Sequence, residues 1–285
     1  MTLTRAEVAD LLARVGRHPS RALGQNFVVD ANTVRRIARL AAVGEGDRVV
    51  EIGAGLGSLT LALAETGAAV TAVEVDRHLV PLLREQVEPR GVRVVEGDAL
   101  RLDWAALLGG GDGDGGSGGG GGGGPWVLVA NLPYNLATPL VADLLDGVPA
   151  IRRMLVMVQR EVAERLAARA GDEAYGAVSV KVAYWAEATV VGAVPASVFL
   201  PRPNVESALV SIVRRPAPAT DADPARLFSL VRAGFGQRRK MLRRSLAGLV
   251  GPDDFAAAGI RPEARAEELG VEEWGRLAAC APPPS

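Results

Sequence analysis

The sequence is poor in the features that mark membrane proteins, disulfide-bonded domains and cysteine-bound metal sites. Its 285 residues include no uncharged apolar run of the ~18 residues that a membrane span needs. The start of the chain carries Glu7 and Asp10 and has no compact apolar stretch, so it predicts a helix opened by a capping box of Thr4 and Glu7 rather than a signal peptide. The single cysteine, Cys280, excludes an internal disulfide and a cysteine metal cluster. These absences predict a cytoplasmic protein.

An excess of positive charge is also lacking, since 32 lysines and arginines oppose 33 aspartates and glutamates. The formal net charge of −1 therefore gives no reason to expect a polyanionic partner. The local distribution is more informative, because residues 226–244 contain seven basic side chains and no acidic one. Such a patch can contact phosphates even when the whole chain is balanced. Lysine is nearly absent (Lys181 and Lys240 only), which a compositional bias explains as well as a function does.

The pattern of apolar residues predicts an α/β fold. Hydrophobic residues make up 48% of the chain, enough for one sizeable core and a smaller appended domain. Short β-branched stretches alternate with helical segments, and Pro81 fits only the first turn of its helix. Strands that alternate with helices in this way predict a doubly wound parallel sheet, a Rossmann-like fold. We expect the strands at residues 48–53, 68–76, 92–99, 125–135 and 152–159, and the helices at 58–67, 77–88, 139–147 and 161–170.

The ends of the chain differ from this alternating region. Residues 1–45 predict a helical extension, with Asp30 as an N-cap. Beyond Tyr175, residues 188–200 and 204–215 predict two strands around the proline-rich FLPRPN, forming an antiparallel pair at the sheet edge. A linker at 214–224 precedes short helices up to Ala281. The predicted domains are 1–215 and a C-terminal helical domain at 216–285, with a flexible glycine-rich insert at 109–124 that buries nothing.

A glycine turn follows the first predicted strand of the sheet. EIGAGLGS contains Gly53, Gly55 and Gly57, and glycines at such a turn let the backbone approach a ligand closely. A dinucleotide fingerprint would need glycine where Ser58 stands, which disfavours a nicotinamide oxidoreductase. The GxGxG spacing suits S-adenosylmethionine, which has no pyrophosphate to bind. The alternative is a tight structural turn without a ligand.

Acidic residues end the next two predicted strands. Glu74 is placed to accept hydrogen bonds from both ribose hydroxyls of such a cofactor, and Asp76 could take its place. Asp98, in EGDA, is placed to accept from the adenine amine of the cofactor. A helix N-cap is the alternative for Asp98.

The most specific motif is NLPYN, residues 131–135, at the end of a predicted strand. The adenine N6 amine is a poor nucleophile because its lone pair is delocalised into the ring. The Asn131 side-chain oxygen and the Leu132 carbonyl would hold its two protons, while Pro133 would fix the direction of that carbonyl. Tyr134 would stack on the flipped base. The alternative is a proline turn with an amide cap.

Two further segments are candidates for the same site. In GQNFVVD, Asn26 and the Val28 backbone would close over the methionine end of the cofactor, unless the segment is a simple helix–helix connection. Phe199, in FLPRPN, is either the second stacking face for the base or a buried residue at a strand end.

The basic segment FGQRRKMLRRS, residues 235–245, puts arginines on more than one face of a predicted helix. Arg238, Arg239, Lys240 and Arg243 are candidate contacts to RNA phosphates, because no acid lies among them. The alternative is a solvated surface helix.

These motifs, with MVQREVAERL, AYGAVSVKVAYW, VFLPRPNVESALV and GFGQRRKMLRRSL, resemble the bacterial 16S rRNA adenine dimethyltransferase family nearly from end to end. The resemblance implies transfer of four methyl groups to two adjacent adenines in a hairpin loop near the 3′ end of 16S rRNA. It implies a monomer that uses S-adenosylmethionine without a metal and acts late in assembly on the immature 30S subunit, with a link to kasugamycin resistance. The 23S rRNA methylases of macrolide resistance share the catalytic half, but residues 175–185 and 235–246 fit the small-subunit enzymes better.

By this resemblance, the cofactor-binding positions of the family fall on Asn26, Val28, Gly53, Glu74, Asp98 and Asn131, and its target-base loop falls on Leu132, Pro133 and Tyr134. The glycine-rich insert departs from the family pattern, but it lies in a connection. A non-catalytic RNA-binding assembly or transcription factor on the same fold is a further hypothesis. Intact Glu74, Asn131 and Tyr134 argue against it, because a site that has lost its activity has no reason to keep them.

Overall fold

The chain forms two compact units in a computed structural model that describes residues 2–20, 23–109, 124–133 and 136–281. The first unit comprises Met1–Ala163 and Val190–Val213, and the second comprises Glu164–Thr189 and Arg214–Ser285. The second unit therefore includes residues 164–189, which the predicted boundary at 215 assigned to the first domain. The glycine-rich insert predicted at 109–124 lies, apart from its two end residues, outside the described residues.

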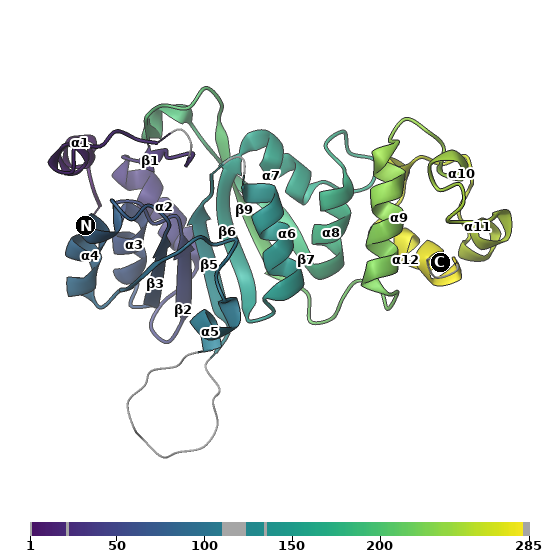
Figure 1. Cartoon of the computed structure of the whole chain (residues 1–285), viewed down its shortest axis with the longest axis horizontal. Coiled ribbons are helices and arrows are strands. Elements are labelled where there is room, and N and C mark those ends of the chain that lie inside the picture. Colours follow the sequence, from purple (N-terminus) through teal and green to yellow (C-terminus); the bar gives the residue numbers. More distant parts are fainter. Residues whose placement is uncertain (1, 21–22, 110–123, 134–135, 282–285) are drawn as a thin grey trace, which may run out of the picture. The chain divides into compact units, whose positions relative to one another are not determined.

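A seven-stranded sheet, ordered β4-β3-β2-β5-β6-β9-β7, organises the first unit (Figure 1). The pairs β2–β3, β2–β5, β3–β4 and β5–β6 are parallel, which confirms the predicted Rossmann-like fold. The two late strands lie at one end of the sheet, where β9 runs antiparallel to β6. The strands are β2 (Arg48–Ile52), β3 (Ala69–Glu74), β4 (Arg93–Glu96), β5 (Trp126–Asn131), β6 (Ile151–Gln159), β7 (Ala186–Val194) and β9 (Ser207–Arg214).

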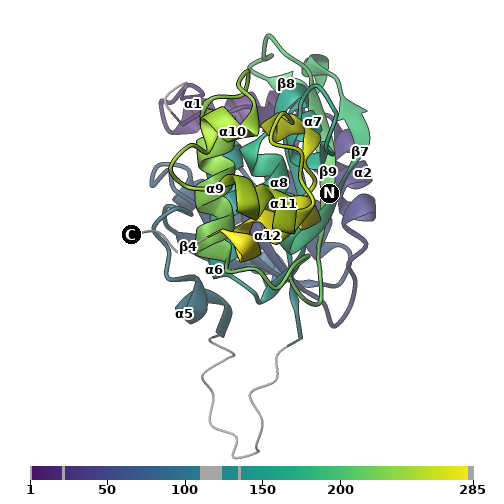
Figure 2. The ribbon, with the colours of Figure 1, turned by 90° about the vertical axis from the view of Figure 1, so that its right-hand side faces the viewer.

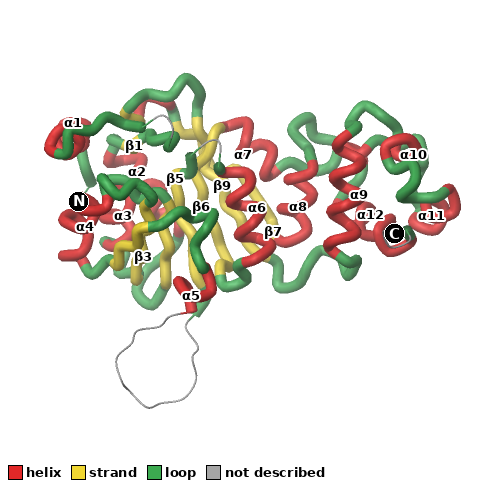
Figure 3. Tube along the Cα trace, viewed as in Figure 1, coloured by secondary structure: helices red, strands yellow, loops and turns green. Residues whose placement is uncertain are grey.

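Helices flank these strands, as the tube view shows (Figure 3). The Thr4–Glu7 capping box, the Asp30 N-cap and the position of Pro81 in a first turn are all confirmed. Within the described residues, no helix has both the length and the apolar character to cross a membrane. The helices are α1 (Arg5–Arg14), α2 (Ala31–Ala41), α3 (Ser58–Ala64), α4 (Val80–Val87), α5 (Trp104–Gly109), α6 (Ala137–Gly147) and α7 (Arg160–Ala167), with a 3-10 turn η1 (Glu88–Arg90).

The order of the strands brings the ends of β2, β3 and β5 together. Their central residues are apolar and buried, and one cluster joins them to α2 and α3. Because the three strands are parallel neighbours, their carboxyl ends share one edge of the sheet, where ligands of such folds bind. A short ladder between β1 (Phe27–Val28) and β8 (Phe199–Leu200) ties the N-terminal segment to the first unit.

Helices make up most of the second unit. α9 and α12 lie side by side in Figure 2, and Trp274 of α12 is 0% exposed. The short helices predicted after residue 224 are present, but α8 was not predicted, because its sequence AVSVKVAYW has little helical amphipathicity. The helices are α8 (Ala177–Trp185), α9 (Pro224–Gly236), α10 (Leu242–Ser245), α11 (Pro252–Ala258) and α12 (Val271–Cys280), with 3-10 turns η2 (Ala196–Val198), in the first unit, and η3 (Ala266–Glu268).

The packing of α9 against α12 predicts that Gly234→Ala destabilises the second unit. A Cβ at Gly234 would lie 2.7 Å from Trp274 Cη2, and Trp274 is fully buried in the apolar core of the second unit. Overpacking of this kind costs about 1–3 kcal/mol. Urea unfolding measures the effect. Gly236→Ala is the control, because its Cβ meets no atom within 4 Å, and equal stabilities for the two variants would contradict this account of the packing.

Candidate functional site

A cavity in the first unit opens where β2, β3 and β5 end. The N-terminal segment, the glycine turn, the end of β3 and the end of β5 each contribute to its wall. It is lined by Val8, Leu23, Gly24, Gln25, Asn26, Phe27, Val28, Val34, Ile37, Glu51, Gly53, Ala54, Gly55, Leu56, Ser58, Leu59, Glu74, Val75, Asn131 and Pro133. Six of the seven predicted cofactor positions thus lie around one cavity, and Asp98 is the exception.

The glycine turn needs glycine for structural reasons as well. Gly53, Gly55 and Gly57 have φ of 72°, 59° and 91°, a region that disfavours other residues. A Cβ at Gly55 would lie 2.9 Å from Phe27 Cε1, and one at Gly57 would lie 2.8 Å from Val87 Cγ1. The turn therefore satisfies the structural alternative, and it also borders the cavity, so the two explanations are compatible.

Glu74 holds this turn in place from the end of β3. Its side chain is 5% exposed, Oε2 accepts a hydrogen bond from Gly55 N at 2.7 Å, and Oε1 accepts one from Asp76 N at 2.8 Å. Burial raises the pKa of the Glu74 carboxyl, and these backbone hydrogen bonds oppose the rise. A carboxylate has about four acceptor positions, so both oxygens can still accept from a ligand.

Asp76, the alternative to Glu74, has a different partner. Its Oδ2 accepts from Gln25 Nε2 at 2.9 Å and its Oδ1 from His78 N at 3.0 Å, and it does not line the cavity. Asp76 therefore anchors the N-terminal segment, and Glu74 is the acid that faces the cavity.

The end of β5 is joined to the N-terminal segment by a hydrogen bond. Asn131 Nδ2 donates to the Asn26 carbonyl at 2.9 Å, and Asn26 Nδ2 donates to the Gly24 carbonyl at 3.1 Å. Since the amide nitrogen of Asn131 faces Asn26, its Oδ1 points to the other side of the amide group. Residues that are 105 positions apart in the sequence thus meet at one wall of the cavity.

The rest of NLPYN is only partly described. Leu132 is 2% exposed and its backbone N–H donates to the Met157 carbonyl at 3.0 Å, so its side chain is part of the core. Pro133 lines the cavity, and its carbonyl accepts from the amides of Leu136 and Ala137. Tyr134 lies outside the described residues.

Two further predicted site residues, Asp98 and Phe199, do not line the cavity. Asp98 Oδ1 accepts from Leu100 N at 3.0 Å in a local turn and does not cap α5, whose first-turn amide at Ala106 is bound by Asp103. Phe199 is 1% exposed within the apolar core, as expected for a buried residue at a strand end. Their roles toward cofactor and base stay predictions.

Glu51, in β2, was not predicted as a site residue. It lines the cavity at 2% exposure, and its Oε2 has no hydrogen-bond partner within the described residues. Burial raises the pKa of Glu51 to about 8, and the negative charge of Glu74 adds to the rise. The nearby Thr60 hydroxyl opposes the rise. Glu51 Oε2 and the Thr60 hydroxyl are nevertheless not within hydrogen-bonding geometry of each other. An acid among the apolar residues of VVEIG was the available sequence signal.

The basic segment does not form one helix, so that prediction is wrong. α9 ends at Gly236 and α10 begins at Leu242, which leaves Arg238, Arg239 and Lys240 on the connection between them. A glycine followed by a residue with non-helical φ and ψ, Gln237, ends the first helix.

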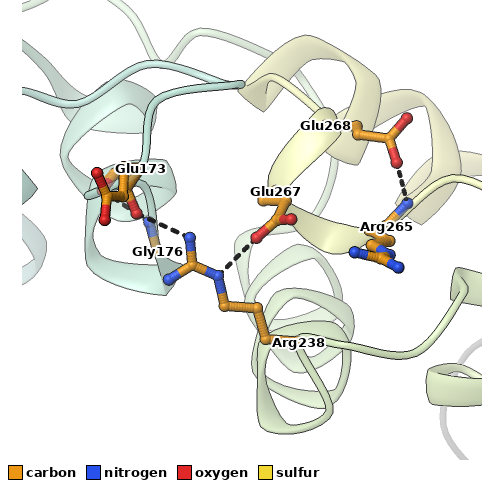
Figure 4. A network of polar contacts seen from close by, with 7 residues as sticks. Glu173, Gly176, Arg238, Arg265, Glu267 and Glu268 are labelled. Carbon is orange, nitrogen blue, oxygen red and sulfur yellow. Dashed lines mark hydrogen bonds and ion pairs between the residues drawn. The ribbon is translucent and has the colours of Figure 1, made fainter.

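Acids from later in the chain neutralise part of this basic segment. Arg238 Nε donates to Glu267 Oε2 at 2.6 Å, and its Nη2 donates to the Glu173 carbonyl at 2.8 Å (Figure 4). Arg243 pairs with Glu263 at 3.4 Å. Arg239 and Lys240 are exposed and form no ion pair within the described part of the chain. Arg244 is likewise exposed and forms no ion pair there, so Arg239, Lys240 and Arg244 are the segment's most available cations.

No group of three or more His, Cys, Asp or Glu side chains that could hold a metal ion occurs in the described ranges. The parallel sheet, the glycine turn and the acid at the end of the next strand together define a class I methyltransferase.

The comparisons with known proteins identify the family. The profile described as ribosomal RNA adenine dimethylase matches residues 18–281, and the chain belongs to this family. It is 46% identical to ribosomal RNA small subunit methyltransferase A of Thermobifida fusca over 97% of this chain and 95% of the relative. It is 48% identical to the protein of the same name from Kineococcus radiotolerans, over 98% and 92% of the two chains.

Solved structures agree on the fold. The 23S rRNA methyltransferase ErmE is 26% identical, with a TM-score of 0.65 over 89% of this chain and 98% of that one. A dimethyladenosine transferase from Plasmodium falciparum is 22% identical, with a TM-score of 0.70 over 87% and 94%.

The double use of Glu74 predicts that Glu74→Gln weakens binding of S-adenosylmethionine. Both oxygens accept backbone N–H groups, so an amide NH₂ would oppose one of these donors and loosen the turn. We expect a loss of affinity of about 10- to 100-fold, measured by calorimetry. Glu96→Gln is the matched control, because Glu96 pairs with Glu74 across β3 and β4 but is exposed. Unchanged affinity in Glu74→Gln would contradict the assignment.

The burial of Glu51 predicts a pH-dependent stability. Between about pH 4.3 and pH 8 the folded state keeps a proton that the unfolded state loses, so the stability of the protein falls as the pH rises through this range. Compared with Glu51→Gln, the unsubstituted protein should lose on the order of 3 kcal/mol between about pH 4 and pH 7. Urea unfolding at several pH values measures this, with exposed Glu45→Gln as the control. A stability difference that is independent of pH would contradict it.

Proposed function

We propose that the chain transfers methyl groups from S-adenosylmethionine to N6 of two adjacent adenines in the 3′-terminal hairpin loop of 16S rRNA. Four methyl groups in all are transferred, within the immature 30S subunit, and the enzyme acts as a cytoplasmic monomer without a metal. The observation that carries the proposal is that Asn131 and Pro133 border the same cavity as Glu74 and the glycine turn. Membership of the adenine dimethylase family supports it.

The cavity offers suitable groups for the cofactor, which supplies a methyl group on a positively charged sulfur. The Glu74 oxygens accept from the ribose hydroxyls, and Gly53 and Gly55 offer only backbone to the cavity beside them. Asn26 and Val28 line the same cavity, and we assign Asn26 and the Val28 backbone to the methionine end of the cofactor. The unpartnered Oε2 of Glu51 fits a ligand of positive charge. Asp98 accepts from the adenine amine, using acceptor positions that its local turn leaves open.

The end of β5 orients the target amine. Asn131 Oδ1 and the Leu132 carbonyl accept its two protons, which draws the nitrogen lone pair out of the ring and toward the methyl group. The hydrogen bond to Asn26 fixes which way the Asn131 amide faces, so its oxygen is oriented before the substrate arrives. Catalysis comes mainly from this positioning, and the proton leaves after methyl transfer, so no strong base is needed. Tyr134 stacks on the base, with Phe199 as the candidate second face.

Recognition of the RNA belongs to the basic connection in the second unit. Arg239 and Lys240 contact phosphates directly, whereas Arg238 and Arg243 do so in competition with Glu267 and Glu263. The 46% and 48% identity to proteins named for the small subunit, against 26% to the 23S enzyme, favours 16S rRNA as the target.

Asn131→Ala should reduce the initial rate of methylation by about 100-fold or more, because it removes an acceptor that is oriented in advance. The assay follows labelled methyl groups into 30S particles that lack the modification, with mass spectrometry of the RNA to locate them. Asn32→Ala, at an exposed position on α2, is the control. A thermal unfolding curve checks that the fold is intact, and a normal rate in a folded Asn131→Ala variant would refute the role.

A further inference from the structure

Glu51 is a buried acid for which the fold supplies no countercharge. Its neighbours in register are Ala72 on β3 and Val129 on β5, both apolar, and Thr60 reaches it from α3. A carboxyl in such surroundings is costly to ionise and gives nothing to the stability of the core. Its Oε2 nevertheless belongs to a residue on the cavity wall and lacks a hydrogen-bond partner within the described residues.

The charged side chains that line the cavity, among the described residues, are both acids, Glu51 and Glu74. Glu74 faces it from β3, and Asp76 lies next to Glu74 just beyond that strand. The N-terminal segment contributes the neutral amides of Gln25 and Asn26, the end of β5 contributes Asn131, and α3 contributes Ser58. No arginine, lysine or histidine occurs among the described residues that line the cavity. A cation for these acids must therefore come from a ligand.

We propose that Glu51 holds a proton while the cavity is empty and releases it to solvent when the positively charged methyl donor binds. The proposal rests on the proposed function for the identity of the ligand. The donor carries one net positive charge, from an ammonium and a sulfonium opposed by one carboxylate. The product has lost the sulfonium charge and is neutral overall. The ionised form of Glu51 thus attracts the donor more strongly than the product.

Charge and burial act in opposite directions on this group. Burial keeps the pKa of Glu51 at about 8 in the empty cavity, so at pH 7 the protonated form exceeds the ionised form by about ten to one. A positive charge within about 4–6 Å favours the carboxylate. Donor binding then releases a proton, and loss of the sulfonium charge after transfer favours its return. Ionised Glu51 would therefore favour binding of the donor over binding of the product, which must leave after the transfer.

Proton release can be counted by titration calorimetry. The unsubstituted protein is titrated with S-adenosylmethionine at pH 7 in two buffers of different ionisation enthalpy, and then with S-adenosylhomocysteine. We expect release of about 0.9 proton per donor molecule and clearly less per product molecule. Glu51→Gln should abolish this release, because glutamine resembles the protonated acid but cannot ionise. Glu45→Gln, exposed and just before β2, should keep it. The amine of the cofactor titrates equally in all three proteins, so it cancels in the differences.

The possible results separate this inference from the proposed function. Donor binding without proton release by the unsubstituted protein would overturn the inference and leave the methyltransferase assignment intact. Equal proton release in Glu51→Gln and the unsubstituted protein would also overturn it. Failure of the unsubstituted protein to bind the donor at all would overturn both. The count on the unsubstituted protein does not depend on any variant, so misfolding of Glu51→Gln would not protect the inference.

Discussion

The hydrogen bond from Gly55 N to the buried Glu74 carboxyl is the contact on which the geometry of the site depends. It joins the turn after β2 to the end of β3, two neighbouring parallel strands. The glycine turn has positive φ at three positions, and the Glu74 carboxyl adds to the backbone hydrogen bonds and to the buried Leu56 side chain that also hold it. Because the same carboxyl borders the cavity, one residue both sets the shape of the turn and offers acceptors to a ligand.

A second set of contacts closes the cavity from the N-terminal side. Gln25 bonds to Asp76 after β3, Asn26 accepts from Asn131 at the end of β5, and Phe27 pairs with Leu200 in the β1–β8 ladder. Each bond joins this segment to a different part of the first unit. These contacts connect the proposed cofactor side of the cavity to the proposed base side, because Asn131 belongs to both. Because the Asn26 backbone carbonyl is the acceptor, a shift of the backbone at Asn26 would disturb both sides together.

The sequence predicted those parts of the molecule that depend on local pattern. Alternation of β-branched and helical stretches gave the parallel sheet, and the Thr4 and Asp30 caps gave helix starts, since each depends on residues within a few positions. The helix α8 was missed because it has apolar residues on several faces. The ion-pair partners of Arg238 and Arg243 were missed because Glu267 and Glu263 lie 20 or more positions away in the sequence. Counting the charges within residues 226–244 cannot reveal them. Glu51 was missed as a site residue because its burial comes from the neighbouring strands β3 and β5, and no motif spacing in the sequence marks it.

The acids of the two units differ in whether they have a cationic partner. In the first unit, acids face the cavity without a counter-ion among its described lining, which suits a small cation. In the second unit, acids pair with Arg238 and Arg243, and Arg239, Lys240 and Arg244 are left exposed without an ion pair among the described residues. Binding a phosphate at a paired arginine exchanges one ion pair for another and gains little, whereas binding at an unpaired cation releases condensed counterions and adds affinity. The number of unpaired cations, and not the seven basic residues of 226–244, should therefore govern how steeply RNA affinity falls with salt.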